Sequence, residues 1–187
     1  MGKKIGILLE NRFIDREILY YQTRFAEEGL EPVFLSRLWG QEALTFRGLE
    51  LGLEMTVRDS FEALSDGGLA EYGCILVPAG YVADYLLYSE KPKEKSPAVQ
   101  FIERAMGRGD ILKAFICHSL WLAGPLAETF SGRHVTCHNN IISHVENAGM
   151  VFEDRDLCTD GDLITARTGG DHALLAREII RRLQADA

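Results

Sequence analysis

Short apolar runs alternate along the chain with longer stretches in which apolar residues recur at helical spacing. This alternation is typical of a parallel sheet whose two faces are both covered by helices. The sequence therefore predicts an α/β domain. The predicted strands are Lys4–Leu9, Pro32–Ser36, Cys74–Val77, Ile111–Ile116 and three short candidates, His134–Thr136, Met150–Phe152 and Leu163–Thr165.

Four stretches have a helical pattern, and two of them carry clear end signals. Gly29 ends the first, because glycine readily adopts the left-handed conformation found after helices. Ser96 is a predicted N-cap, and Pro97 follows it at the first helical position, where proline is tolerated. The helical stretches are Asp15–Glu28, Ser96 to about Arg108, a stretch that begins at His118, and Asp171–Leu183.

Two remaining segments have weaker patterns. Leu49–Val57 alternates loosely between apolar and polar residues and is interpreted as a hairpin on the edge of the sheet. Tyr85–Lys95 has no assigned element and is expected to pass over the rim of the active site and shape its pocket. No repeat or low-complexity tract interrupts the chain, so residues 1–187 are interpreted as one domain.

Charge narrows the choice of partners. The 187 residues include 20 basic and 28 acidic side chains, a formal net charge of −8. Nucleic-acid sites require clustered Lys and Arg, so this balance argues against a nucleic-acid partner. No apolar stretch is long enough to span a membrane. The apolar run that begins at Ile5 is too short for a secretory signal, and we therefore expect a cytoplasmic protein.

The four cysteines form no C-x-x-C motif, which argues against zinc-ribbon and thioredoxin sites. They are expected to be free thiols, as is usual in a reducing compartment. Cys74 is assigned to the core, whereas Cys158 is expected to be exposed and oxidisable. Neighbouring side chains on a strand point to opposite faces, so Cys137 and His138 are not interpreted as metal ligands. No metal or other cofactor is predicted.

One cysteine lies where a strand passes directly into a helical pattern. Cys117 follows the apolar run that ends at Ile116, and the helical pattern begins at His118. Such a junction projects a side chain from the carboxyl end of a parallel sheet, where open α/β sheets bind their ligands. The free N–H groups of the helix start, at His118 and Ser119, are expected to lower the thiol pKa and to bind an oxyanion. A buried structural cysteine is the alternative.

The segment Ala114–Trp121, with Cys117 at its centre, resembles a known nucleophile elbow. The other matching segments are the opening strand with Phe13–Tyr20, Val77–Gly80, Arg133–Thr136, Asn147–Gly149 and Asp160–Arg167. In this order the segments are similar to the ThiJ/PfpI family over nearly the whole chain. The resemblance implies a flavodoxin-like three-layer α/β/α sandwich with a mostly parallel sheet, a nucleophilic Cys117 and no cofactor.

The resemblance assigns further residues to the site. Glu17 matches a glutamate that approaches the cysteine, and a carboxyl group in such a pocket is expected to have a raised pKa and to move protons. Gly80 matches a residue whose N–H faces a substrate oxygen, although the family often has glycine where this chain has Ala79. His138 matches a histidine near the pocket rim of some relatives. Asp84 matches an acid with which a neighbouring subunit orients the histidine after the nucleophile, which implies a homodimer or larger homo-oligomer.

Three functions remain open from the sequence. The leading hypothesis is a cysteine-dependent enzyme that acts on reactive carbonyls or glycated adducts, as the glyoxalases and proposed deglycases of the family do. The second is a PfpI-type amidase or peptidase that forms an acyl-enzyme. The third is a redox sensor or holdase chaperone in which Cys117 is oxidised and nothing is turned over. The two enzymes would take a small carbonyl compound or a peptide as substrate.

Overall fold

Seven strands form the central sheet of the protein, and the computed structural model describes residues 4–185. The strand order is β10-β11-β7-β6-β1-β2-β5, and every neighbouring pair is parallel except β10 with β11. The predicted mostly parallel sheet is confirmed. The strands are β1 Lys4–Leu8, β2 Glu31–Ser36, β5 Asp59–Ser60, β6 Tyr72–Val77, β7 Leu112–Ile116, β10 Leu157–Asp160 and β11 Leu163–Ala166.

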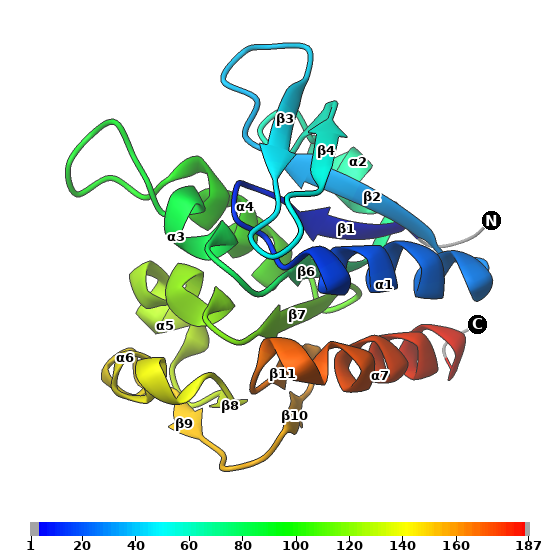
Figure 1. The fold of residues 1–187 in the computed structure, drawn as a ribbon. Coiled ribbons are helices and arrows are strands. Elements are labelled where there is room, and N and C mark those ends of the chain that lie inside the picture. Colours follow the sequence, from blue (N-terminus) through cyan, green and yellow to red (C-terminus); the bar gives the residue numbers. More distant parts are fainter. Residues whose placement is uncertain (1–3, 186–187) are drawn as a thin grey trace.

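Helices cover both faces of this sheet (Figure 1). α1 (Asp15–Glu27) and α7 (His172–Ala185) lie side by side on one face. The chain steps from β1 to β2 in one direction across the sheet and from β6 to β7 in the opposite direction. Because crossovers between parallel strands are right-handed, α4 (Pro97–Met106) lies on the other face. The three layers are those of the flavodoxin-like sandwich that the sequence predicts.

The centre of the sheet is fully enclosed. Every residue of β6, β7 and β11 is buried, which explains why these strands are nearly continuous apolar runs. Aromatic side chains fill the space between the layers, and the stacked rings of Phe61 and Phe101 have centroids 5.4 Å apart. Burial of one large apolar side chain contributes about 1.5–3 kcal/mol. The core thus fixes the three strands whose carboxyl ends meet at the site described below.

The predicted helix signals act as expected. Ser96 caps α4, because its hydroxyl accepts the N–H of Val99 at 3.2 Å, and Pro97 occupies the first helical position. Gly29 follows α1 with a φ of 72°, the left-handed conformation that ends helices.

The hairpin differs from the prediction in extent and in place. Its strands are β3 (Leu44–Arg47) and β4 (Glu54–Val57), which pair only with each other and form a separate sheet. The connecting turn is held by Asp15, whose fully buried carboxylate accepts the N–H groups of Glu50 and Leu53 at 2.8 Å each. The sequence pattern alone does not reveal this anchor, because Asp15 reads as an ordinary first-turn acid.

Short elements account for the other differences. The predicted strands near His134 and Met150 are β8 (His134–Val135) and β9 (Val151–Phe152), which pair in parallel away from the main sheet. β10 is missing from the prediction because an edge strand with mixed exposure has a weak apolar pattern. The remaining short elements are α2 Asp66–Leu69, α3 Val82–Leu86, η1 Ser119–Leu126, α5 Ala127–Phe130, η2 Asn139–Ile141, α6 Ile142–Asn147 and η3 Gly169–Asp171.

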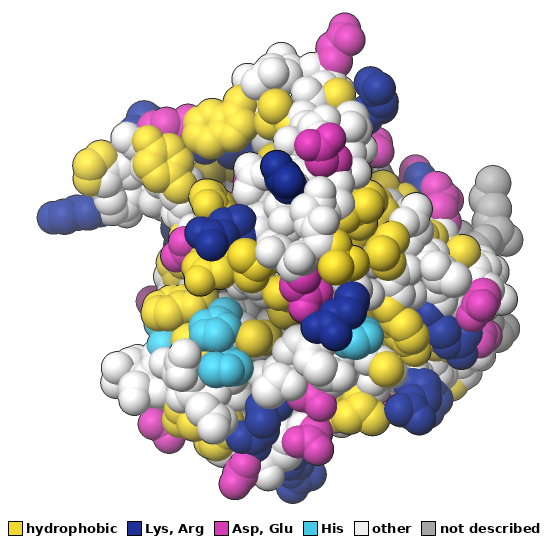
Figure 2. Space-filling model, viewed as in Figure 1, with side chains coloured by type: hydrophobic (Ala, Val, Ile, Leu, Met, Phe, Trp, Pro, Cys, Tyr) yellow, Lys and Arg dark blue, Asp and Glu magenta, His cyan; other side chains and the backbone are white. Residues whose placement is uncertain are grey.

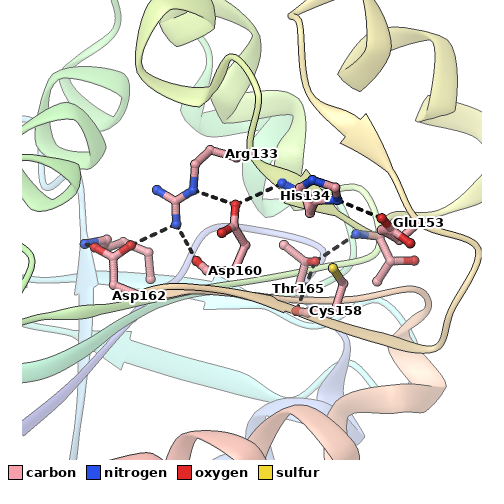
Figure 3. A network of polar contacts seen from close by, with 9 residues as sticks. Arg133, His134, Glu153, Cys158, Asp160, Asp162 and Thr165 are labelled. Carbon is pink, nitrogen blue, oxygen red and sulfur yellow. Dashed lines mark hydrogen bonds and ion pairs between the residues drawn. The ribbon is translucent and has the colours of Figure 1, made fainter.

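A network of charged side chains joins β7, β8 and the β10–β11 turn (Figure 3). Arg133 donates to the Asp160 carboxylate at 2.9 Å and to the Asp162 carboxylate at 2.8 Å. Asp162 also pairs with Lys113, a fully buried lysine on β7, whose ammonium donates to the carbonyl of Arg108 at 2.8 Å. Burial lowers the pKa of Lys113, and Asp162 opposes that effect. Asp162 therefore compensates two cations at the end of the sheet remote from Cys117.

We expect Asp162→Asn to destabilise the protein by roughly 3 kcal/mol, because removing one member of a buried ion pair leaves the other charge uncompensated. Urea denaturation followed by circular dichroism measures this loss. The matched control is Asp110→Asn, which removes a mostly exposed acid paired with Arg108 and should hardly move the midpoint. Equal midpoints for the two variants would contradict the structural role assigned to Asp162.

Candidate active site

Cys117 occupies a strained turn directly after β7. Its φ is 63°, a left-handed conformation that costs about 1–3 kcal/mol for a residue with a side chain. Three hydrogen bonds hold the turn. Cys117 N–H donates to Ala166 O at 3.0 Å, His138 N–H donates to Cys117 O at 3.1 Å, and Ile116 N–H donates to the Ser119 hydroxyl at 2.6 Å. The predicted elbow is thus present, and β11 helps to fix it.

A cavity of about 760 Å³ opens at the carboxyl ends of β6, β7 and β11. Its volume is in the range of small-molecule sites. Figure 2 shows histidine side chains gathered among hydrophobic ones on the side of the molecule where α5 and α6 lie. The cavity is lined by Ile14, Arg16, Glu50, Ala79, Gly80, Tyr81, Asp84, Cys117, His118, Trp121, Asn140, Gly169, Gly170 and His172.

His118 lies against the nucleophile. Its Nδ1 is 3.1 Å from the Cys117 sulfur, and its ring stacks on that of His138 with centroids 4.4 Å apart. Burial lowers the pKa of His118, and the neighbouring His138 lowers it further. An imidazole with a lowered pKa is neutral at neutral pH and can accept the thiol proton. His138 is not among the residues that line the cavity. The structure places it against the ring of His118, whereas the resemblance implies a position near the pocket rim.

The prediction of a lowered thiol pKa is wrong. Burial raises the pKa of Cys117, and the backbone N–H groups of Gly169 and His118 oppose that effect without outweighing it. The segment after the elbow is the 3₁₀ helix η1, which contains Pro125, rather than the start of an α-helix. Burial of the sulfur is the largest cause and decides the direction of the shift. At neutral pH the resting site holds a thiol, and a base must remove its proton.

Glu17 is buried in the first turn of α1. Its side chain is fully buried, and both carboxyl oxygens accept the N–H of Ala79, at 3.2 and 3.0 Å. Burial raises the pKa of Glu17 to about 8, although the nearby Tyr21 hydroxyl and the Ala79 N–H oppose it. A charge on Glu17 raises the pKa of Cys117, so the two groups are electrostatically coupled. The raised pKa of Glu17 agrees with the sequence-based expectation.

The loop after β6 brings Gly80 into the cavity. Gly80 has a φ of 90°, and a Cβ atom there would lie 2.5 Å from the carbonyl oxygen of Arg12. Only glycine fits this close approach to the Arg12 carbonyl, whereas the expected role of the Gly80 N–H toward a substrate oxygen stays a prediction. The preceding Ala79 is tolerated because its N–H is directed at Glu17 and its side chain is buried.

Asp84 lines the same cavity within one chain. It lies on α3, is exposed, and makes no hydrogen bond to His118 among the described residues. Within one chain, Asp84 therefore lies at the mouth of the site but does not orient His118.

The structure also places Ser119 and His172. The Ser119 side chain is buried and accepts a hydrogen bond from Ile116 N–H, so it stabilises the elbow, and Ser119 is not among the residues that line the cavity. The expected role of its N–H as an oxyanion donor stays a prediction. His172, to which the sequence assigns no role, lines the cavity, and its Nδ1 lies 2.7 Å from Gly169 O. Because that oxygen is an acceptor, Nδ1 is the protonated nitrogen.

The structure also differs from the expectations for the segment 85–95 and for Cys158. No residue of the segment 85–95 is among those that line the cavity, because α3 turns this loop away from the site. Cys74 is in the core as predicted, but Cys158 is only 6% exposed, since it lies on the inner face of β10. Cys158 is therefore not the accessible thiol that the sequence suggests.

Sequence reasoning missed Gly169 and Gly170, which follow β11 and form the third side of the elbow. A pair of glycines a few residues after a predicted strand was the available signal, because the residues after β6, β7 and β11 meet at one sheet edge. It also missed Arg16 and Glu50, an ion pair on the cavity wall whose nearest atoms are 2.5 Å apart. Their contact spans the start of α1 and the hairpin turn and has no sequence signature.

A family model described as DJ-1/PfpI matches residues 3–182. The chain belongs to this family. The family model covers both the elbow and the buried glutamate, and the fold agrees with it. Among the residues that the structure describes, no group of three or more His, Cys, Asp or Glu side chains is arranged to hold a metal ion, and no helix is long and apolar enough to cross a membrane.

Individual relatives cover nearly the full chain. An Escherichia coli (strain K12) protein named protein/nucleic acid deglycase 2 is 30% identical over 99% of this chain and 100% of its own length. YraA of Bacillus subtilis (strain 168), whose name marks it as a candidate cysteine protease, is 26% identical over 98% of this chain and all of its own. A two-domain Anabaena variabilis protein with a DJ-1/ThiJ/PfpI-like domain superposes with a TM-score of 0.84 at 26% identity, covering 98% of this chain and 48% of that one.

We expect alkylation of Cys117 by iodoacetamide to rise with pH through an inflection above that of a free thiol, about 8.5. Burial of the sulfur is the physical reason. Site-resolved mass spectrometry measures the rate at each pH, and the same cysteine in urea-unfolded protein is the control. An inflection below that of the unfolded protein would mean that the N–H groups around the sulfur outweigh its burial.

Proposed function

We propose that this member of the DJ-1/PfpI family is an enzyme that adds Cys117 to a reactive carbonyl compound or a glycated adduct. The observation that carries the proposal is the pairing of Cys117 with a neutral His118 at one cavity, together with a protonated, fully buried Glu17 that is electrostatically coupled to Cys117. A thiol, a base and an acid are the three groups that carbonyl addition requires.

The first step follows from these protonation states. His118 takes the thiol proton, the sulfur forms a bond to the carbonyl carbon, and the π electron pair of the C=O bond moves to oxygen. A proton from Glu17 neutralises that oxygen and yields a thiohemiacetal, which leaves Glu17 as a carboxylate and His118 as an imidazolium. The backbone of Gly80 and Gly169 is next to the developing oxyanion. Transfer of the His118 proton back through the bound intermediate restores the resting protonation states of His118 and Glu17, so the addition step is balanced in protons.

The deglycase name of the Escherichia coli relative supports this substrate class. The raised thiol pKa disfavours the alternative of a redox sensor, because oxidation proceeds through the thiolate. A second candidate function is amidase or peptidase action. It is favoured by Asp84 at the mouth of the cavity and by the name of the Bacillus subtilis relative.

A panel assay tests the proposed function. Wild-type protein is incubated with methylglyoxal, with glycated peptides and with chromogenic amides, beside Cys117→Ala as the control. We expect turnover of a carbonyl substrate or a glycated peptide, and at least about a hundredfold loss in the variant, since covalent catalysis requires the sulfur. Turnover of amides alone would favour the second function. Turnover of carbonyl substrates that persists in Cys117→Ala would contradict the mechanism.

We further propose that assembly completes the site and that Asp84 orients His118 of a neighbouring subunit. α3 and its flanks carry three exposed tyrosines at helical spacing, Tyr81, Tyr85 and Tyr88, which are 45%, 44% and 59% exposed. Figure 2 shows hydrophobic side chains gathered over α3 and the loop after it. An exposed apolar face beside Asp84 supports contact with a second copy at this position.

Mixing two inactive variants tests the role of Asp84. Cys117→Ala and Asp84→Ala proteins are combined under conditions that allow subunit exchange. In a dimer that exchanges freely, half of the pairs are mixed and one of the two sites in each is complete, so about a quarter of wild-type activity should return. Absence of recovery despite exchange detected by native mass spectrometry would mean that Asp84 does not act on a neighbouring subunit.

A further inference from the structure

The hydroxyl group of Tyr21 is unexplained by the fold or by the proposed reaction. Tyr21 is fully buried, and its hydroxyl has no hydrogen-bond partner of ordinary geometry among the described residues. A buried hydroxyl without a partner costs free energy that a phenylalanine at the same position would not cost. Such a group calls for a specific reason.

The neighbour that this hydroxyl faces is Glu17. Tyr21 lies four residues after Glu17 on α1, so the two side chains share one face of the helix, and both are fully buried. The ring of Tyr21 stacks on Phe25 with centroids 5.6 Å apart, which holds the hydroxyl beside the carboxyl group. Electrostatic coupling runs both ways, because a charge on Glu17 raises the pKa of Tyr21 and the hydroxyl acts to lower the pKa of Glu17.

The other groups around the pair do little to stabilise a charge on Glu17. Ala79 N–H is a single donor shared by both carboxyl oxygens. Glu50 on the hairpin turn raises the pKa of Glu17, and a thiolate at Cys117 would repel it. The other titratable groups beside the tyrosine are Tyr20 on α1, Cys74 on β6 and His172 on α7. Among these groups, only the Tyr21 hydroxyl offers Glu17 a second donor.

We propose that Tyr21 is a positioning residue for Glu17, whose hydroxyl turns to donate to the carboxylate and so allows Glu17 to release its proton as well as hold it. This inference rests on the proposed function, in which Glu17 gives a proton to the substrate oxygen and later regains it. Tyr21 keeps its own proton throughout. Without its hydroxyl, the carboxylate would be left in an apolar pocket with one shared donor, and Glu17 would stay protonated.

The test is a direct titration of Glu17. Protein labelled with ¹³C at glutamate carboxyl carbons is titrated by NMR, and the Glu17 signal is assigned by its loss in Glu17→Gln. We expect the wild-type carboxyl to titrate near 8 and Tyr21→Phe to raise that value by about one pH unit. Tyr20→Phe is the matched control, since it removes a hydroxyl from the adjacent half-buried tyrosine and should leave Glu17 unchanged. Tyr21→Phe keeps the ring that packs on Phe25, so it should fold.

A second variant should shift the Glu17 titration midpoint in the opposite direction. A fluorinated tyrosine at position 21 is a stronger donor and should lower the Glu17 titration midpoint. Where a substrate is turned over, Tyr21→Phe should reduce kcat about tenfold or more with little change in KM, because proton release is affected rather than binding. An unchanged Glu17 midpoint in both variants would overturn the inference. A shifted midpoint in a protein that turns over none of the panel substrates would support it and count against the proposed function instead.

Discussion

Burial of one carboxyl group without a compensating cation governs the electrostatics of the candidate site. Glu17 is fully enclosed, and among the described residues it has no ion-pair partner. Its raised pKa, about 8, keeps the group protonated at neutral pH. Two neighbouring groups are coupled to this carboxyl group. The N–H of Ala79 is directed at the carboxyl oxygens, which fixes the loop that carries Gly80, and the Cys117 thiol avoids a negative charge beside it.

The same low-polarity environment acts on the whole site. Burial raises the pKa of Cys117 and lowers that of His118, so the three groups that would exchange protons are all neutral at rest. A neutral resting site differs from a preformed thiolate–imidazolium pair. Under the proposed function, reaction would require a proton transfer triggered by the substrate, and the protonated sulfur would resist oxidation between turnovers. The strained elbow positions the sulfur. The hydrogen bond from Cys117 N–H to Ala166 O of β11 holds Cys117 where the carboxyl ends of three strands meet.

Much of the fold followed from local sequence signals. Continuous apolar runs located β6 and β7 because both strands are buried on both faces, and Ser96 and Pro97 located the start of α4. The signals failed where distant contacts decide. Asp15 reads as a helix-start acid, yet its buried carboxylate holds the hairpin turn, and β10 depends on pairing with β11. The resemblance located Cys117, Glu17 and Gly80 in one region, and the cavity brings Cys117 and Gly80 together with Asp84. Their catalytic roles stay predictions.

The pKa shifts and ion pairs of the site could not be predicted from the sequence in the same way. A helix start after Cys117 suggested a lowered thiol pKa, but burial of the sulfur outweighs the N–H groups of Gly169 and His118 and raises the pKa. The ion pair of Arg16 with Glu50 and the position of Tyr21 beside Glu17 likewise arise from packing between elements. Residue type and order predict which groups meet at a sheet edge, whereas their protonation depends on how much water the fold excludes.

The central claim is that Glu17 is protonated at neutral pH and acquires its charge next to Cys117 as the pH rises. The most direct measurement compares the pH dependence of Cys117 alkylation in the wild type and in Glu17→Gln, whose side chain stays neutral. The account predicts that the thiol of the wild type ionises at higher pH than that of the variant, with the two profiles separating above about pH 8, where Glu17 becomes charged. Superimposable profiles across the whole range would contradict it.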